Sequence, residues 1–211
     1  MRGKRYYSGL LLLFFVCLAG CGGGGGAPGS SGSENTGIII KSVNITDAGS
    51  TEGATGKEVD VNVHMCDATT AEPGLFIHIQ TLNISADKLN PSAASDPFPA
   101  SIEQCTITYI KANSDPASPV IETMTVYPNC TLIAGEDNAC IFSLMDIQRK
   151  NDWWDAMPAS INPSGSGLNI PAEYPTHYIA TVRCKYMSNY GSSGYCQSEF
   201  DIWLADWNLC A

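Results

Sequence analysis

The chain has 211 residues, of which 44% are hydrophobic and 15% charged, and it contains nine cysteines. This length suits one domain with a hydrophobic core of its own. The 11 lysines and arginines are outnumbered by 21 aspartates and glutamates, which excludes a nucleic-acid-binding protein because no surplus of cations is left to neutralise phosphates. The 20 glycines do not recur at every third position, which excludes a collagen-like chain.

The first 20 residues have the form of an export signal. Three cations precede an apolar run at residues 10–18, and this run is too short to span a bilayer. The run ends in Leu18-Ala19-Gly20-Cys21, which resembles the lipobox of bacterial lipoproteins. The resemblance implies that residues 1–20 are removed as a signal peptide. It also implies that Cys21 becomes the first mature residue and carries the acyl chains, palmitate among them, that anchor the protein to a membrane.

A glycine- and serine-rich segment follows the cysteine. In the lipoproteins of Gram-negative bacteria, aspartate directly after the lipidated cysteine favours the inner membrane, so Gly22 favours the outer membrane, on its periplasmic or its cell-surface side. Residues 21–36 then form a flexible tether with a root-mean-square span of roughly 20 Å. The folded domain is expected over residues 37–211.

Removal of the signal peptide changes the charge of the protein. Three of the 11 cations and none of the 21 acids precede Cys21, so the mature chain has eight cations, 21 acids and a net charge of −13. Such a domain is repelled by anionic lipid and nucleic acid and favours basic partners or divalent cations. The alternative is that the charge serves solubility alone.

The domain shows the two-residue period of β-strands. In residues 57–65, Val59, Val61, Val63 and Met65 alternate with polar residues, which is typical of a half-buried antiparallel strand. Seven similar segments lie between clusters of Gly, Pro, Ser and Asn, at residues 37–46, 74–85, 101–112, 120–127, 140–149, 177–187 and 195–206. About eight strands predict an all-β sandwich or barrel.

Only one segment is a candidate for a helix. Residues 143–157 contain Ser143 and Asp146, which are spaced as a capping box. The apolar residues before Asp146 favour a strand for the first half, with a short helical turn for the remainder.

The end of the chain carries a second resemblance. Tyr178, Ala180, Val182 and Cys184 share one face of a strand, and a turn and a closing strand over 200–207 follow. This resembles the last hairpin of immunoglobulin-like and fibronectin type III sandwiches, in which a tyrosine packs at a corner where the strand begins. The resemblance implies an immunoglobulin-like antiparallel β-sandwich of about seven to nine strands. Because the domain exceeds one ordinary unit of about 100 residues, long loops are expected at 87–100 and 156–176.

Seven cysteines remain after Cys17 leaves with the signal and Cys21 is lipidated, and in an exported protein they predict disulfide bonds. No spacing matches a zinc or haem motif. Two pairs each close a short turn, Cys130 with Cys140 and Cys184 with Cys196. The pairing of the other three is left open: Cys66, Cys105 and Cys210.

Nothing in the sequence has the form of a catalytic site. Neither Gly-x-Ser-x-Gly nor His-Glu-x-x-His occurs, and His64, His78 and His177 each stand alone in a strand pattern. We therefore assign no catalytic residue and expect a protein that is not an enzyme. A metal site shared by His64 and His78 on neighbouring strands is the alternative to two exposed histidines.

No cofactor and no metal ligand is assigned. The acidic cluster at residues 135–138 and the pair Asp152 and Asp155 offer oxygen atoms, but the alternating Asp-x-Asp loop of a calcium site is absent. Calcium stays an alternative.

Aromatic residues are the candidates for ligand binding. Trp153 and Trp154 are adjacent, so they cannot both face one core, and an exposed tryptophan binds sugar rings or a protein partner. Tyr186, Tyr190 and Tyr195 surround the last turn, and loops are where sandwich folds bind. The alternative is that one tryptophan covers the open end of the sandwich.

We expect a membrane-anchored lipoprotein that acts as a non-catalytic binding or surface-assembly module for a protein partner. A carbohydrate-binding module that uses exposed tryptophans for a polysaccharide is the alternative, and an enzyme domain is the third possibility.

Overall fold

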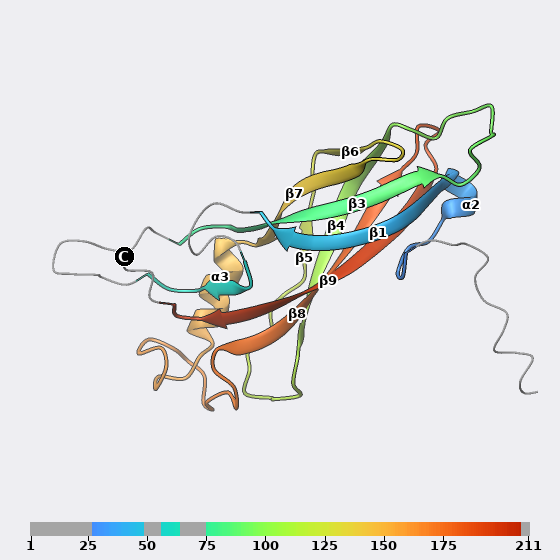
Figure 1. The fold of residues 1–211 in the computed structure, drawn as a ribbon. Coiled ribbons are helices and arrows are strands. Elements are labelled where there is room, and N and C mark those ends of the chain that lie inside the picture. Colours follow the sequence, from blue (N-terminus) through green and yellow to red (C-terminus); the bar gives the residue numbers. More distant parts are fainter. Residues whose placement is uncertain (1–26, 49–55, 64–74, 208–211) are drawn as a thin grey trace, which may run out of the picture.

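A computed structural model describes residues 27–48, 56–63 and 75–207. Within these residues, nine strands form two sheets that pack face to face (Figure 1), which confirms the all-β sandwich predicted from the alternation. The first sheet has three antiparallel strands, in the order β1 (Ile38–Asp47), β3 (His78–Lys88) and β7 (Asp137–Met145).

The second sheet has six strands, of which three adjacent ones, β9, β8 and β4, are long. Its order is β2 (Glu58–Asp60), β9 (Ser193–Ala205), β8 (Thr176–Met187), β4 (Ala100–Lys111) and β5 (Met124–Val126), and β6 (Cys130–Leu132) also pairs with β4. All pairs are antiparallel except β2 with β9, which is parallel.

The core lies between the sheets, where the alternation places the apolar side chains. On β8 every second residue is buried, and these include Tyr178, Ala180, Val182 and Cys184, the four expected to share a face. On β3 the inward positions begin with two polar residues, His78 and Gln80, before the pattern becomes apolar.

The largest departure from the expected strands is a helix, α3 (Ile147–Asp155). The strand predicted to run to residue 149 ends at Met145, because the Asp146 side chain accepts a hydrogen bond from the backbone N–H of Arg149 and caps the helix. Asp146 is thus the N-cap itself, and Ser143 stays in β7. The three-residue strand β6 was not expected, and β2 is shorter than the predicted strand 57–65, whose last two residues lie outside the described residues.

The domain begins earlier than Gly37. The backbone of Ser31 exchanges two hydrogen bonds with Tyr195 on β9, and the backbone N–H of Ala27 donates to the carbonyl of Ile40 on β1. A short helix follows, α2 (Ser33–Thr36). Residues 27–36, expected to be part of the tether, are therefore packed on the sandwich.

Two disulfides lie within the part of the chain that the structure describes. Cys130 is joined to Cys140, while Cys184 is joined to Cys105 on β4 and not to Cys196, which is a buried free thiol. This corrects the expected pairing of Cys184 with Cys196. Cys66 and Cys210 lie outside the described residues.

Strand geometry explains the choice of partner for Cys184, since Cys105, Cys184 and Cys196 lie directly opposite one another on adjacent strands. The backbone N–H and C=O of Tyr195 point away from β8, toward Ser31. Because these groups alternate in direction along a strand, those of the next residue, Cys196, point toward β8 and form a hydrogen-bonded pair with Cys184. Cys184 then makes a non-hydrogen-bonded pair with Cys105, where side chains approach more closely. Their Cα atoms are 4.0 Å apart.

Candidate binding surfaces

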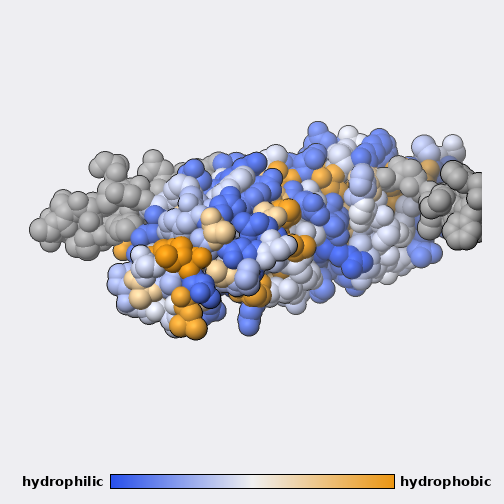
Figure 2. Space-filling model, turned by 90° about the horizontal axis from the view of Figure 1, so that it is seen from below, coloured by the Kyte–Doolittle hydropathy of each residue, from blue (hydrophilic) through white to orange (hydrophobic). Residues whose placement is uncertain are grey.

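Exposed apolar side chains gather on two long loops beside α3. Leu168 is 94% exposed, Val120 81% and Ile170 61%. We call these three residues the loop-end surface. Figure 2 shows apolar side chains collected at this end of the molecule, among polar ones. Isolated exposed apolar residues are ordinary, whereas a group of them makes a surface a candidate for contact with another molecule.

Side-chain hydrogen bonds join the two loops. The carboxylate of Asp115 accepts hydrogen bonds from the backbone N–H of Ala172, at 2.6 Å, and of Ala117, at 2.9 Å. These bonds lower the pKa of Asp115, since they stabilise its charged form. Asn113 donates to the carboxylate of Glu173, at 3.0 Å. Loop 112–123 and loop 156–175 are therefore held together rather than projecting separately.

Helix α3 and strand β8 fix the first of these loops. The guanidinium of Arg149 donates to the carbonyls of Glu122, at 2.9 Å, and Thr123, at 2.8 Å. The hydroxyl of Tyr178 donates to the carbonyl of Pro119, at 2.7 Å, directly beside Val120. The loop thus presents Val120 from a backbone that is hydrogen-bonded on both sides, and a hollow of about 400 Å³ lies between Val120 and the end of β4.

The expected ligand-binding tryptophan is part of this scaffold instead. Trp153 is 1% exposed, and its indole N–H donates to the Tyr178 hydroxyl, at 2.8 Å. Burial raises the pKa of Tyr178, so its hydroxyl stays protonated and serves as both donor and acceptor. Trp154 is half-buried. Trp153 is therefore not a ligand-binding residue: it covers the end of the sandwich, which was the other reading given for one of the two tryptophans.

Of the three tyrosines around the last turn, one is buried and two are exposed. Tyr186 is buried, and its hydroxyl donates to the carbonyl of Ser31 in the N-terminal segment, which removes it from the candidate binding surface. Tyr190 is 51% exposed. Tyr195 stacks with the guanidinium of Arg183, 4.4 Å from its ring centre.

The histidines and acids do not form a metal site in the described part of the chain, where no group of three or more potential ligands comes together. His78 is buried and bonds the carbonyl of Gly56, so it is not the exposed histidine expected, and His64 lies outside the described residues. His177 pairs with the carboxylate of Asp201, at 2.9 Å.

In the acidic cluster, the Asn138 side chain bonds backbone groups of its own turn and of β3, which shows a structural role for that residue. Asp152, of the second acidic pair, accepts a hydrogen bond from Gln148 one turn earlier in α3.

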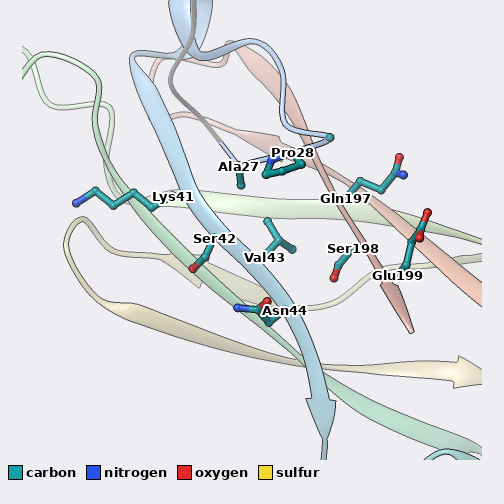
Figure 3. Close-up of a pocket in the computed structure, with 10 residues that line it drawn as sticks. Ala27, Pro28, Lys41, Ser42, Val43, Asn44, Gln197, Ser198 and Glu199 are labelled. Atoms are coloured by element: carbon teal, nitrogen blue, oxygen red, sulfur yellow. The ribbon is translucent and has the colours of Figure 1, made fainter. Parts of the chain in front are cut away.

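A second surface lies where the edges of the two sheets meet. A hollow of about 520 Å³ runs between Ser42–Asn44 on β1 and Gln197–Glu199 on β9, with Ala27 and Pro28 at one end (Figure 3). We call it the seam groove. Val43 packs against the core but stays half-buried, so the groove opens onto apolar surface.

Sequence reasoning did not find the loop-end surface. A signal for it exists in Leu168 and Ile170, which are large apolar residues inside a segment rich in Gly, Ser, Asn and Pro. Val120 was assigned to the strand predicted at 120–127, but that strand begins only at Met124.

Comparison with known proteins adds little. No family model and no curated protein matches the chain. Among solved structures, a DUF3823 family protein from Bacteroides ovatus matches with 12% identity and a TM-score of 0.28. The match covers 81% of this chain and 56% of the other, so this chain spans little more than half of that protein. The fold assignment therefore rests on the strand order of this chain itself. No helix within the described residues is long and apolar enough to cross a membrane.

Proposed function

We propose that the protein is an outer-membrane lipoprotein, anchored through Cys21, that binds a protein partner without catalysing a reaction. The observation that carries the proposal is the loop-end surface: three apolar side chains on loops whose backbone is hydrogen-bonded in place. Preordered loops lose little conformational entropy on binding. Each of these side chains contributes about 2 kcal/mol when a partner covers it fully.

The arrangement of the chain supports this reading. The N-terminal segment and α2 lie at one end of the sandwich, and α3 with the two loops lies at the other (Figure 1). An anchor at Cys21 would hold the first end near the membrane and direct the loop-end surface away from it.

We also infer that the sandwich is immunoglobulin-like. When the strands are lettered along the chain, the sheet β1-β3-β7 has the order A-B-E and the sheet β9-β8-β4-β5 has the order G-F-C-C′. In this lettering β2 is an extra strand between A and B. Loop 112–123 then joins C to C′ and loop 156–175 lies between E and F, so the loop-end surface is at the end opposite the B–C and F–G loops that variable domains use for binding.

The experiment is purification of the intact lipoprotein from its own cell envelope after chemical cross-linking. We expect a partner protein in stoichiometric amount with the wild type and its loss from the double variant Val120→Asp/Leu168→Asp. The matched control is Ile141→Asp, since Ile141 is also apolar and 65% exposed but lies on β7. A partner that stays bound to the double variant, or is lost equally from the control, would contradict the proposed site.

A polysaccharide is the second candidate ligand, and a polar hollow favours it. This hollow, about 380 Å³, lies on the outer face of the six-stranded sheet and is lined by threonines together with Gln104, Arg183 and Tyr195. The test is calorimetric titration with envelope polysaccharides, comparing Tyr195→Ala with Tyr190→Ala. Binding that only the first variant loses supports this candidate, and no heat with the wild type rejects it.

A further inference from the structure

The edge of β9 has an open stretch between two occupied ones. At Tyr195 it exchanges backbone hydrogen bonds with Ser31, of 2.8 and 3.1 Å, in an antiparallel bridge. From Trp203 to Ala205 it pairs with β2. Backbone groups of a strand alternate in direction, so Gln197, Glu199 and Asp201 also direct their N–H and C=O groups to this edge. Within the described residues these three have no backbone partner there.

The facing edge belongs to β1. This strand pairs with β3 on one side, and on the other side the one backbone bond made by residues that the structure describes, from Ala27 to Ile40, closes its beginning. From Ser42 onward it borders the seam groove, with the half-buried Val43 toward the core (Figure 3). The groove therefore offers both things that an added β-strand requires: unpaired backbone groups along one wall and apolar surface at its floor.

We propose that the seam groove binds an extended segment of another polypeptide, which adds a strand to β9. Gly29 lies against Gln197, since a Cβ on Gly29 would be only 3.0 Å from the Gln197 Cβ. The open stretch is therefore the four residues 198–201, which correspond to about 13 Å of strand. Residues of the segment that lie opposite Glu199 and Asp201 share the outer face of the sheet with them. The residues between point inward, toward Val43.

Charge selects the occupant. Glu199 lines the groove, and Asp201, whose carboxylate bonds His177, follows it on the same face of β9. The lysine that lines the groove, Lys41, is ion-paired with Asp87. The segment therefore carries Lys or Arg at the outward position opposite Glu199 and apolar residues at the inward ones.

A second copy of this chain is disfavoured, because its own edge brings the same acids and a mature net charge of −13. The glycine run at 22–26 has no side chains with which to cover Val43.

The test uses a blocked eight-residue peptide that alternates valine with lysine or threonine. We expect binding to slow hydrogen exchange at the amides of Glu199 and Asp201, observed by NMR, and to leave the loop-end surface unchanged. The same peptide with glutamate for lysine should bind about threefold more weakly or worse. A peptide N-methylated along its pairing edge should not bind. Unchanged exchange at both amides overturns the proposal.

Two variants locate the site. Glu199→Pro removes one outward N–H without removing a bond to β8, and it should weaken peptide binding about fivefold or more. Glu199→Lys keeps the backbone and reverses the charge, which should abolish the preference for lysine over glutamate. The control variant Leu168→Asp should bind the peptide as the wild type does. A result that contradicts the seam-groove proposal can therefore be told apart from one that contradicts the proposed loop-end surface. An unaltered preference in Glu199→Lys contradicts the proposal even if the proline variant fails to fold.

Discussion

Lys150 is the least usual residue in the core. It lies on α3, is fully buried, and its ammonium has no hydrogen-bond partner among the described residues. Burial lowers the pKa of Lys150 to about 8, against an opposing effect of the Asp60 carboxylate. A cation in this position costs stability at neutral pH, because the charged form loses its hydration.

The substitution Lys150→Met tests this cost. Between the folded pKa of about 8 and the unfolded value of 10.5, the unfolded state binds more protons, so wild-type stability rises with pH across this window. We expect the variant to be more stable at pH 7, by an amount up to roughly 3 kcal/mol. The difference in the free energy of unfolding between the variant and the wild type should shrink toward pH 10.5. Urea unfolding at several pH values measures it, and a variant less stable than the wild type at pH 7 would show that Asp60 compensates the charge.

The three cysteines in one row give a second prediction at this scale. In Cys105→Ser, Cys184 loses its partner and Cys196 is its other direct neighbour, but a hydrogen-bonded pair holds the side chains farther apart. Burial also raises the pKa of Cys196 to about 12, which suppresses the thiolate that exchange requires. We expect both thiols to stay reduced and the free energy of unfolding to fall by about 4 kcal/mol, since a 79-residue loop is opened. A peptide linking Cys184 to Cys196 in a non-reducing digest would contradict this.

Helix α3 is the element that connects the core to the proposed binding loops. Asp146 caps it and forms an ion pair with Arg149, and Arg149 in turn bonds two carbonyls of loop 112–123. Asp146→Ala should therefore lower the free energy of unfolding by about 1 kcal/mol and also speed hydrogen exchange in that loop. Asp152→Ala is the control, since Asp152 lies on the same helix but its side chain bonds the exposed Gln148. Equal loop exchange in the two variants would show that α3 does not order the loop.

Alternation in the sequence was enough to predict the long strands, because each buries one complete face. It overextended the strand into α3, since the apolar residues before Asp146 favoured a strand, and the capping signal was assigned to Ser143 and not to Asp146. It also assigned Cys184 to its hairpin neighbour Cys196, because a sequence does not reveal that β4 lies on the other side of β8 at the closer kind of pair. The interpretation of Trp153 as a ligand-binding residue was wrong for a similar reason. Its buried indole is hydrogen-bonded to the hydroxyl of Tyr178, which is distant in the sequence.

At the scale of the whole molecule, the docked N-terminal segment shortens the tether that was predicted over residues 21–36. If Cys21 is lipidated, only residues 21–26 separate it from the packed residues, and six residues reach about 20 Å even when fully extended. The end that carries α2 then faces the bilayer. The start of loop 89–99 lies at the same end, because the backbone N–H of Leu89 donates to the carbonyl of Gly37.

Energy transfer can test this orientation in reconstituted vesicles. A donor fluorophore is attached through an azide-bearing amino acid at Asn90, near the α2 end, or at Asn169, beside the loop-end surface, and the acceptor is carried by lipid headgroups. We expect more efficient transfer from residue 90 than from residue 169, because a tether of this length does not let the domain turn over. Insertion of 20 Gly-Ser residues before Ala27 should bring the two efficiencies together, since a long flexible chain removes the constraint. Equal transfer with the native tether would contradict the orientation, and Cys21→Ala protein that still remains on the vesicles would contradict the anchor.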